Sequence, residues 1–123
     1  MKRTITLTGR APVKIDDSLW PIIAKASTFS GEHECQANTI AWIRVRRHAD
    51  GRVLVYGCRE SGPGGWPVGA AGWRGGELLS DMDSPAIARA MLRMLHGLEG
   101  GFCAIGARAL VEEAIGSLPA EEI

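Results

Sequence analysis

The stretch WIRVRRHADGRVLVYGC, residues 42–58, decides the fold. Residues that favour β-strands flank the dipeptide Asp50-Gly51 on both sides. The dipeptide itself suits the positive φ angles of a two-residue type I′ turn. We therefore expect an antiparallel hairpin that runs from about Ile40 to about Arg59.

The length of this turn also predicts which side chains share a face of the hairpin. A two-residue loop pairs Ala49 with Arg52 and places Val45 opposite Tyr56. One face then collects Ile43, Val45, Leu54, Tyr56 and Cys58, with Arg47 near its turn end. The opposite face collects Trp42, Arg44, Arg46, His48, Val53, Val55, Gly57 and Arg59. A slip of one residue would exchange these assignments.

Before the hairpin, the chain predicts a strand and then a helix. Residues 4–8, TITLT, alternate between threonine and an apolar residue, as in a half-buried strand that Gly9 and Pro12 end. Asp16, Asp17 and Ser18 are candidate N-caps, and Pro21 is tolerated in a first helical turn. A short N-terminal helix is expected there, with an apolar side made of Leu19, Ile22, Ile23 and Ala26.

After the hairpin, residues 62–76 contain seven glycines, two prolines and two tryptophans. Ordering such a segment costs much backbone entropy, so we expect a long loop, followed by a short strand at Leu78 and Leu79. The last third predicts two helices, one between Ser84 and Gly100 and one from about Cys103 to Ser117.

These elements indicate an α+β fold in a single domain, residues 1–123. A small antiparallel sheet with a central hairpin is covered by two C-terminal helices and one short N-terminal helix. The chain is 46% hydrophobic and 23% charged, which argues against disorder, and it is too short for a large multidomain enzyme. No segment approaches the roughly 20 apolar residues that span a bilayer, so we expect no membrane partner and a cytoplasmic location.

Chemistry-bearing residues are sparse and scattered. The three cysteines form no CxxC pair, so neither a disulfide framework nor a zinc ribbon is predicted, and buried reduced thiols are expected. An enzyme would have to bring His33, Cys35, Cys58 or His48 together in one pocket, which no linear motif supports. We expect no catalytic residue, no metal and no cofactor.

Charge is unevenly distributed, although 14 basic and 14 acidic residues give a net charge of zero. The segment 40–76 has six arginines and two acids, whereas the segment 77–123 has three arginines and eight acids. The arginines gather around the hairpin. Arginine with an aromatic platform is the chemistry of single-stranded nucleic acid recognition, so an alternative nucleic-acid interface is predicted at Trp42, Arg44, Arg46, Arg47 and Arg59. The simpler interpretation of the same residues is a solvated strand face whose arginines pair with acidic helices.

The glycine-rich loop suggests a different role. Its sequence lacks the GxxxxGK[ST] and GxGxxG patterns of phosphate-binding loops. Tryptophan and arginine are enriched at binding hot spots, so the loop and its exit provide candidate anchors for a protein partner at Trp66, Trp73 and Arg74. Tryptophans that fold back on the core are the alternative. Segments of opposite charge are also compatible with a homodimer.

The strings TITLTGRAPVKI, WIRVRRHADGRVLVYG and SLPAEEI resemble a family of small uncharacterised proteins encoded in proteobacterial phages, plasmids and integrated mobile elements. The resemblance covers most of the chain and transfers no catalytic residue. It implies a non-enzymatic accessory protein of a mobile element. We expect a protein-binding module or inhibitor of a host or defence protein, with nucleic-acid binding as the alternative.

Overall fold

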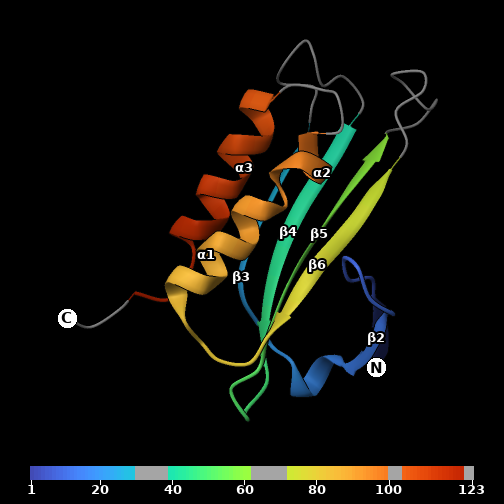
Figure 1. Ribbon diagram of the computed structural model, residues 1–123, viewed down its shortest axis with the longest axis vertical. Helices are drawn as coiled ribbons and strands as arrows, with labels where there is room; N and C mark the ends of the chain where they lie inside the picture. Colours follow the sequence, from blue (N-terminus) through green and yellow to red (C-terminus); the bar gives the residue numbers. More distant parts are fainter. Residues whose placement is uncertain (30–38, 62–71, 100–103, 121–123) are drawn as a thin grey trace.

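A four-stranded antiparallel sheet forms the middle layer of the fold in the computed structural model (Figure 1). The structure describes residues 1–29, 39–61, 72–99 and 104–120. The strands follow one another in the order β3-β4-β5-β6, so each neighbouring pair is a simple antiparallel connection. Their bounds are Ile22–Phe29 for β3, Thr39–Arg47 for β4, Val53–Ser61 for β5 and Trp73–Leu79 for β6.

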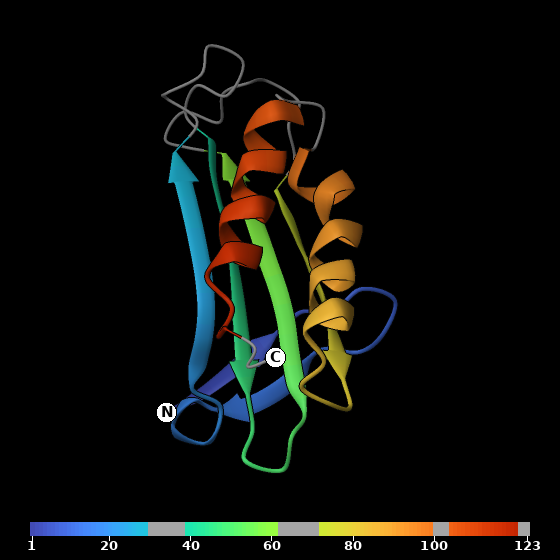
Figure 2. The same ribbon diagram turned by 90° about the vertical axis from the view of Figure 1, so that its left-hand side faces the viewer.

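Helices cover one side of this sheet, which we call the front face (Figure 2). They are α1 (Ser84–Arg93), the short α2 (Leu95–Glu99) and α3 (Ala104–Gly116). The apolar side chains between these helices and the sheet form the larger core. Its fully buried members include Ile43, Val45, Val53, Val55, Ile87, Met91 and Val111. Burying each of these residues stabilises the fold by roughly 1.5–3 kcal/mol.

An N-terminal hairpin lies on the other side of the sheet, which we call the back face (Figure 2). It pairs β1 (Lys2–Ile5) with β2 (Val13–Asp16), and a single 3₁₀ turn, η1 (Asp17–Leu19), leads from it into the sheet. The amide of Thr8 donates to the carbonyl of Gly76 at 2.9 Å, which ties the hairpin to β6. A second, smaller core lies beneath it, formed by Ile5, Leu7, Ile15, Trp20, Leu54 and Tyr56.

The central hairpin forms where the sequence predicts it, but the predicted register is wrong by one residue. Val45 pairs with Val55 instead of Tyr56. The amide of Gly51 donates to the carbonyl of His48 at 3.0 Å, and Gly51 has a φ of 100°. The loop therefore has three residues, a type I turn closed by a glycine at positive φ, and an Asp-Gly dipeptide suits this loop as well as the two-residue one.

This shift exchanges the two faces of β5. Val53, Val55 and Gly57 lie on the front face, with Ile43 and Val45 of β4. Leu54 and Tyr56 lie on the back face and contact the N-terminal hairpin. Cys58 joins them there, because it pairs with Trp42. Side chains alternate along a strand, so one extra loop residue is enough to invert the whole strand.

The predicted N-terminal helix is also wrong, because residues 22–29 form the edge strand β3. The buried Ala24 and Ala26 alternate with the exposed Lys25 and Ser27, which is the period of a strand. Branched residues at Ile22 and Ile23 favour the same outcome. Only η1 forms where the predicted helix was to begin.

The α+β class is confirmed, with three C-terminal helices in place of two. The segment between Ser84 and Glu99 divides at Met94, which caps α1 and precedes α2. The strand predicted at Leu78 and Leu79 is longer and begins at Trp73, inside the predicted loop. The remainder of that loop, residues 62–71, lies outside the described residues.

Candidate functional site

The back face of the sheet carries a group of polar and basic side chains that the N-terminal hairpin leaves uncovered. Trp42 of β4 pairs with Ser27 of β3, and the neighbouring Arg44 pairs with Lys25. Cys58 of β5 pairs with Trp42 on one side and with Arg74 of β6 on the other, so these three side chains lie on the same face of the sheet. The antiparallel register therefore gathers three cations and a tryptophan from three strands on one surface.

A narrow cleft opens between β1 and this surface. Its volume is about 70 Å³. This space holds a few waters or one small anionic group, since a single water needs roughly 10–15 Å³. We call it the Trp42 cleft, and its lining residues are Arg3, Thr4, Ile5, Thr6, Trp42, Arg44, Tyr56, Gly57 and Arg74.

Trp42 and Arg44 form a stacked pair in the wall of this cleft. The guanidinium carbon of Arg44 lies 4.3 Å from the centre of the Trp42 ring. The centres of the Trp42 and Tyr56 rings are 5.6 Å apart, and the two ring planes are nearly perpendicular. The pair also lines a second opening of about 360 Å³ toward β3, together with Lys25 and Glu113. Both side chains are only half-buried. The Arg44 guanidinium therefore extends the flat surface of the Trp42 ring, and this combined surface borders both openings.

Arg3 contributes less net charge to the cleft than its position suggests. Its guanidinium binds both carboxylate oxygens of Asp17, at 2.9 and 3.1 Å. This pair holds the pKa of Asp17 below the ordinary range and raises the pKa of Arg3. Arg44 and Arg74 line the same cleft.

Two of the predicted nucleic-acid contacts are buried, and they lie on opposite faces. Arg46 is 5% exposed on the back face, where it donates to the hydroxyl of Tyr56 at 2.7 Å and to the carbonyl of Trp20 at 2.9 Å. Arg59 is 6% exposed on the front face, and its Nε donates to the carbonyl of Gly97 at 3.0 Å. Burial lowers the pKa of Arg59. The shared face predicted for them is therefore wrong.

Of the other predicted contacts, only Trp42 and Arg44 come together. Arg47 is exposed at the end of β4, on the front face, because it pairs with Val53. Sequence reasoning missed Lys25 and Arg3 as neighbours of this surface. The alternation of apolar and polar residues from Ala24 to Ser27 indicates a strand, but the sequence prediction assigned residues 22–26 to a helix.

The predicted protein anchors separate in a similar way. Trp73 lies on β6 and packs against the front core beside Gly97 of α2, so it is half-buried. Arg74, the next residue, faces the other way into the Trp42 cleft. Trp66 lies outside the described residues.

Basic side chains gather on the back side of the sheet. Among the described side chains, which include all 14 basic residues but only eight of the 14 acids, this side has nine basic groups together with Asp16, Asp17 and Asp50. The basic ones are Lys2, Arg3, Arg10, Lys14, Lys25, Arg44, Arg46, Arg52 and Arg74. The front side has five of each. These are Arg47, Arg59, Arg89, Arg93 and Arg108 against Glu77, Asp81, Asp83, Glu112 and Glu113.

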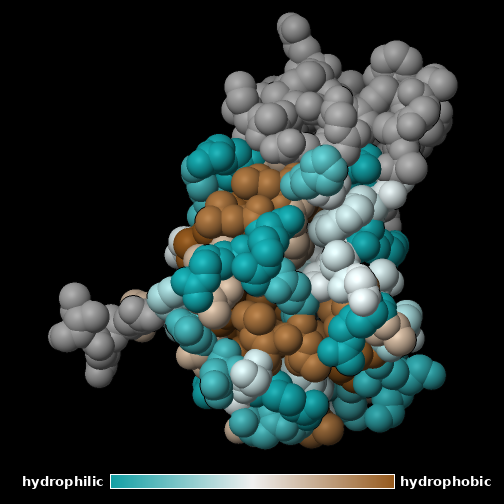
Figure 3. Space-filling model, in the orientation of Figure 1, coloured by the Kyte–Doolittle hydropathy of each residue, from teal (hydrophilic) through white to brown (hydrophobic). Residues whose placement is uncertain are grey.

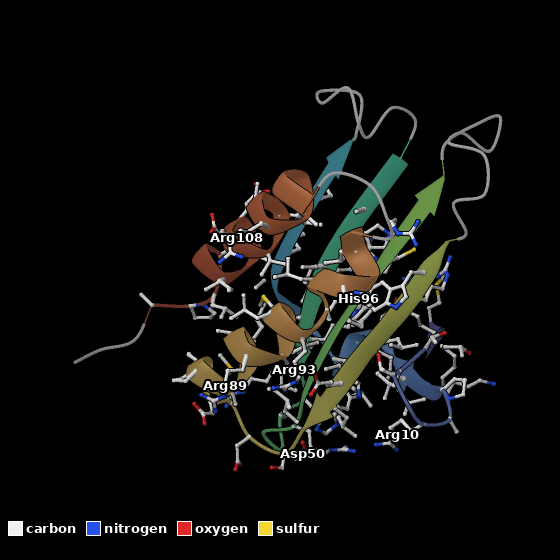
Figure 4. All side chains as sticks on the ribbon, turned by 45° about the horizontal axis from the view of Figure 1, so that its top comes forward. Arg10, Asp50, Arg89, Arg93, His96 and Arg108 are labelled. Carbon is white, nitrogen blue, oxygen red and sulfur yellow. The ribbon has the colours of Figure 1, made fainter. Side chains whose placement is uncertain are left out.

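The front side has a hollow of its own, but its charges are already paired. Trp73, Met94 and Gly97 line it together with Arg93 and His96, which Figure 4 shows on α1 and α2. The Nε and Nη2 atoms of Arg93 each donate to one carboxylate oxygen of Glu77 at 2.7 Å. Figure 3 shows that hydrophilic side chains divide the apolar surface on this side into separate patches.

Metal and catalytic chemistry receive no support from the described residues. They include no cluster of three His, Cys, Asp or Glu side chains placed to hold a metal ion. Cys58 is fully buried, and the Nδ1 of His48 accepts a hydrogen bond from the amide of Asp50. His33 and Cys35 lie outside this part of the chain. No helix in it combines the length and apolar character needed to cross a membrane.

Comparisons with protein-family models, with curated proteins and with solved structures find no match to this chain.

Proposed function

We propose that this chain is a non-enzymatic protein that binds single-stranded nucleic acid on the back face of its sheet. The observation that carries the proposal is the stacked Trp42–Arg44 pair, which shares its face of the sheet with Lys25 and Arg74. A polyanion senses the local surface potential rather than the net charge of the whole chain. A net charge of zero is therefore compatible with a basic binding surface.

The Trp42 cleft supplies the two kinds of contact that a nucleic acid strand needs. A base stacks on the Trp42–Arg44 pair, because every base has a π-face that an aromatic ring or a guanidinium plane can cover. Arg74 and Lys25 lie on either side of that pair and neutralise the flanking phosphates. The small volume of the cleft admits one phosphate or base edge at a time.

The shape of this surface favours single strands over duplexes. The three described helices all cover the front face, so none of them reaches a major groove from the basic side (Figure 1). A flat sheet surface with an aromatic platform instead suits unpaired bases.

The described residues support the protein-binding hypothesis less well than the nucleic-acid-binding one. Trp73 is a half-buried part of the front core, and Arg74 is shared with the basic surface. The setting in a mobile genetic element and an inhibitory action on a host or defence protein rest on the sequence resemblance alone. They stay predictions.

A pair of matched double variants tests the proposal. Arg44→Gln with Arg74→Gln removes two charges from the cleft, and Arg89→Gln with Arg108→Gln removes two exposed charges from the helices (Figure 4). Binding of fluorescently labelled single-stranded DNA and RNA is measured by anisotropy at several salt concentrations. Circular dichroism and thermal unfolding check that both variants fold.

We expect the wild-type chain to bind single strands with an affinity that falls as salt rises. The cleft variant binds about 100-fold more weakly or worse, since each of its two lost charge-assisted contacts contributes roughly 1.5–3 kcal/mol. Its salt dependence becomes shallower by about 0.7 per lost phosphate contact. The helix variant changes neither value. Equal losses in both variants, or no binding by the wild type, would refute the proposal.

A further inference from the structure

A second basic hollow opens on the other flank of the N-terminal hairpin. Its volume is about 410 Å³. The basic side chains of Arg10, Lys14 and Arg52 stand around an apolar floor that includes Trp20, Leu54 and Leu78. We call it the Lys14 hollow. It lies on the back face as well, because Leu54 belongs to the smaller core beneath the N-terminal hairpin and Leu78 packs against that core.

The charges around this hollow are accessible to an anion. Lys14 and Arg10 are exposed. Arg52 lies over the Trp20 ring at 5.1 Å and pairs with Asp50 at 2.8 Å, and both members of this pair are almost half exposed. An exposed ion pair contributes little, so a phosphate can compete with the carboxylate for Arg52. The buried Trp20 serves as floor rather than as a stacking platform.

The hairpin itself joins the two openings. Thr4 lines the Trp42 cleft, Lys14 lines the Lys14 hollow, and the two are direct partners across β1 and β2. Both side chains are exposed, whereas the adjacent Ile5 and Ile15, whose side chains lie on the inner side of the hairpin, are buried. Paired side chains of this kind have Cβ atoms only about 4.5–5.5 Å apart. A single pair of residues therefore separates the two openings.

We infer that the Lys14 hollow is a second binding site for the same single strand, which crosses the hairpin at Thr4 and Lys14. This inference rests on the proposed function and extends it to the length of strand that the protein binds. The apolar floor receives a base, and the basic rim neutralises the phosphates on either side of it. The bound segment then spans both openings.

The test combines a series of oligonucleotide lengths with variants of the second opening. Oligo(dT) of about 4, 8 and 16 nucleotides covers the site sizes known for small single-strand binding folds. Anisotropy titrations compare the wild type, the hollow variant Arg10→Gln with Lys14→Gln, and the helix variant Arg89→Gln with Arg108→Gln. Thermal unfolding confirms that each protein is folded.

We expect wild-type affinity to rise from the shortest oligonucleotide to the longest. The hollow variant binds the shortest one as the wild type does, but it loses about tenfold on the longest, while the helix variant loses nothing. If the hollow variant matches the wild type at every length, or weakens all lengths equally, the inference is overturned and the proposed function stands. If the wild type binds no oligonucleotide, both are overturned.

Discussion

The two faces of the same sheet differ in how completely other elements cover them. On the front face, strand residues such as Ile43 and Val55 have no exposed surface and pack against three helices. On the back face, the hairpin covers Leu54 and Tyr56 but leaves Trp42 half-buried. The front face therefore provides most of the stability. The back face combines a small core with a charged surface, and function is expected where packing is incomplete.

This contrast also explains why Arg44 and Arg46 differ in burial although both lie on the back face of β4. Arg46 lies under the hairpin, where the Tyr56 hydroxyl and the Trp20 carbonyl satisfy it. Arg44 lies beyond the hairpin and stacks on Trp42. Coverage by the hairpin, rather than residue type, separates the buried Arg46 from the accessible Arg44.

The largest effect is expected in the front core. Ile43→Ala removes a fully buried side chain and should lower the free energy of unfolding by about 2–5 kcal/mol. The control is Leu92→Ala, because Leu92 is 44% exposed on α1 and its truncation should change stability by about 0.5 kcal/mol or less. Urea unfolding followed by circular dichroism measures both. A loss below 1 kcal/mol at Ile43 would contradict the assigned core.

The neighbouring arginines Arg46 and Arg47 test the back face in the same way. Arg46→Ala leaves the buried Trp20 carbonyl and Tyr56 hydroxyl without their donor, so stability should fall by about 1–3 kcal/mol. Arg47→Ala alters an exposed side chain and should change it by about 0.5 kcal/mol or less. Urea unfolding monitored by tryptophan fluorescence measures the pair. Similar losses at both positions would contradict the burial of Arg46.

The turn that fixes the register gives a smaller effect. Gly51 has a φ of 100°, so Gly51→Ala should cost about 1–2 kcal/mol although the space around it is open. Gly116, at the end of α3, is equally open, and Gly116→Ala should be neutral or stabilise by up to about 1 kcal/mol. Thermal unfolding compares the two. Equal shifts in Tm would indicate a turn of another type.

The smallest effect concerns acid. The bond to Arg3 lowers the pKa of Asp17, so the pair stabilises the folded chain above the ordinary Asp pKa of about 3.9. That contribution disappears as the pH falls through the lowered value. Asp17→Asn should therefore lose less stability than the wild type between pH 7 and pH 3, as urea midpoints will show. Asp81→Asn, at an exposed acid, is the control and should lose as much as the wild type.

The sequence alone predicts the elements better than their faces. The central hairpin, the α+β class and the C-terminal helices follow from local signals such as the Asp50-Gly51 dipeptide and the Ser84-Pro85 helix start. The register does not follow, because Asp-Gly fits loops of two and of three residues. Residues 22–26 satisfy both a helical and a strand period, and pairing with β4 decides between them.

The candidate site was predictable only in part for the same reason. Trp42 and Arg44 are two apart on one strand, so their common face is visible in the sequence. Lys25 and Arg74 join them only through the pairing of β3, β5 and β6, which no local pattern encodes. The burial of Arg46 depends on the N-terminal hairpin, which starts more than 40 residues earlier in the chain.

The most direct test of the binding face is a titration of the ¹⁵N-labelled chain with a short oligo(dT), followed by two-dimensional NMR. The indole N–H signals of Trp42 and Trp73 report the two sides of the sheet separately, since Trp42 lines the cleft and Trp73 packs under α2. We predict that the Trp42 indole and the amides of Arg44 and Arg74 shift while the Trp73 indole and the amides of α1 do not. Shifts confined to Trp73 and the helices, or no shifts at all, would contradict the account.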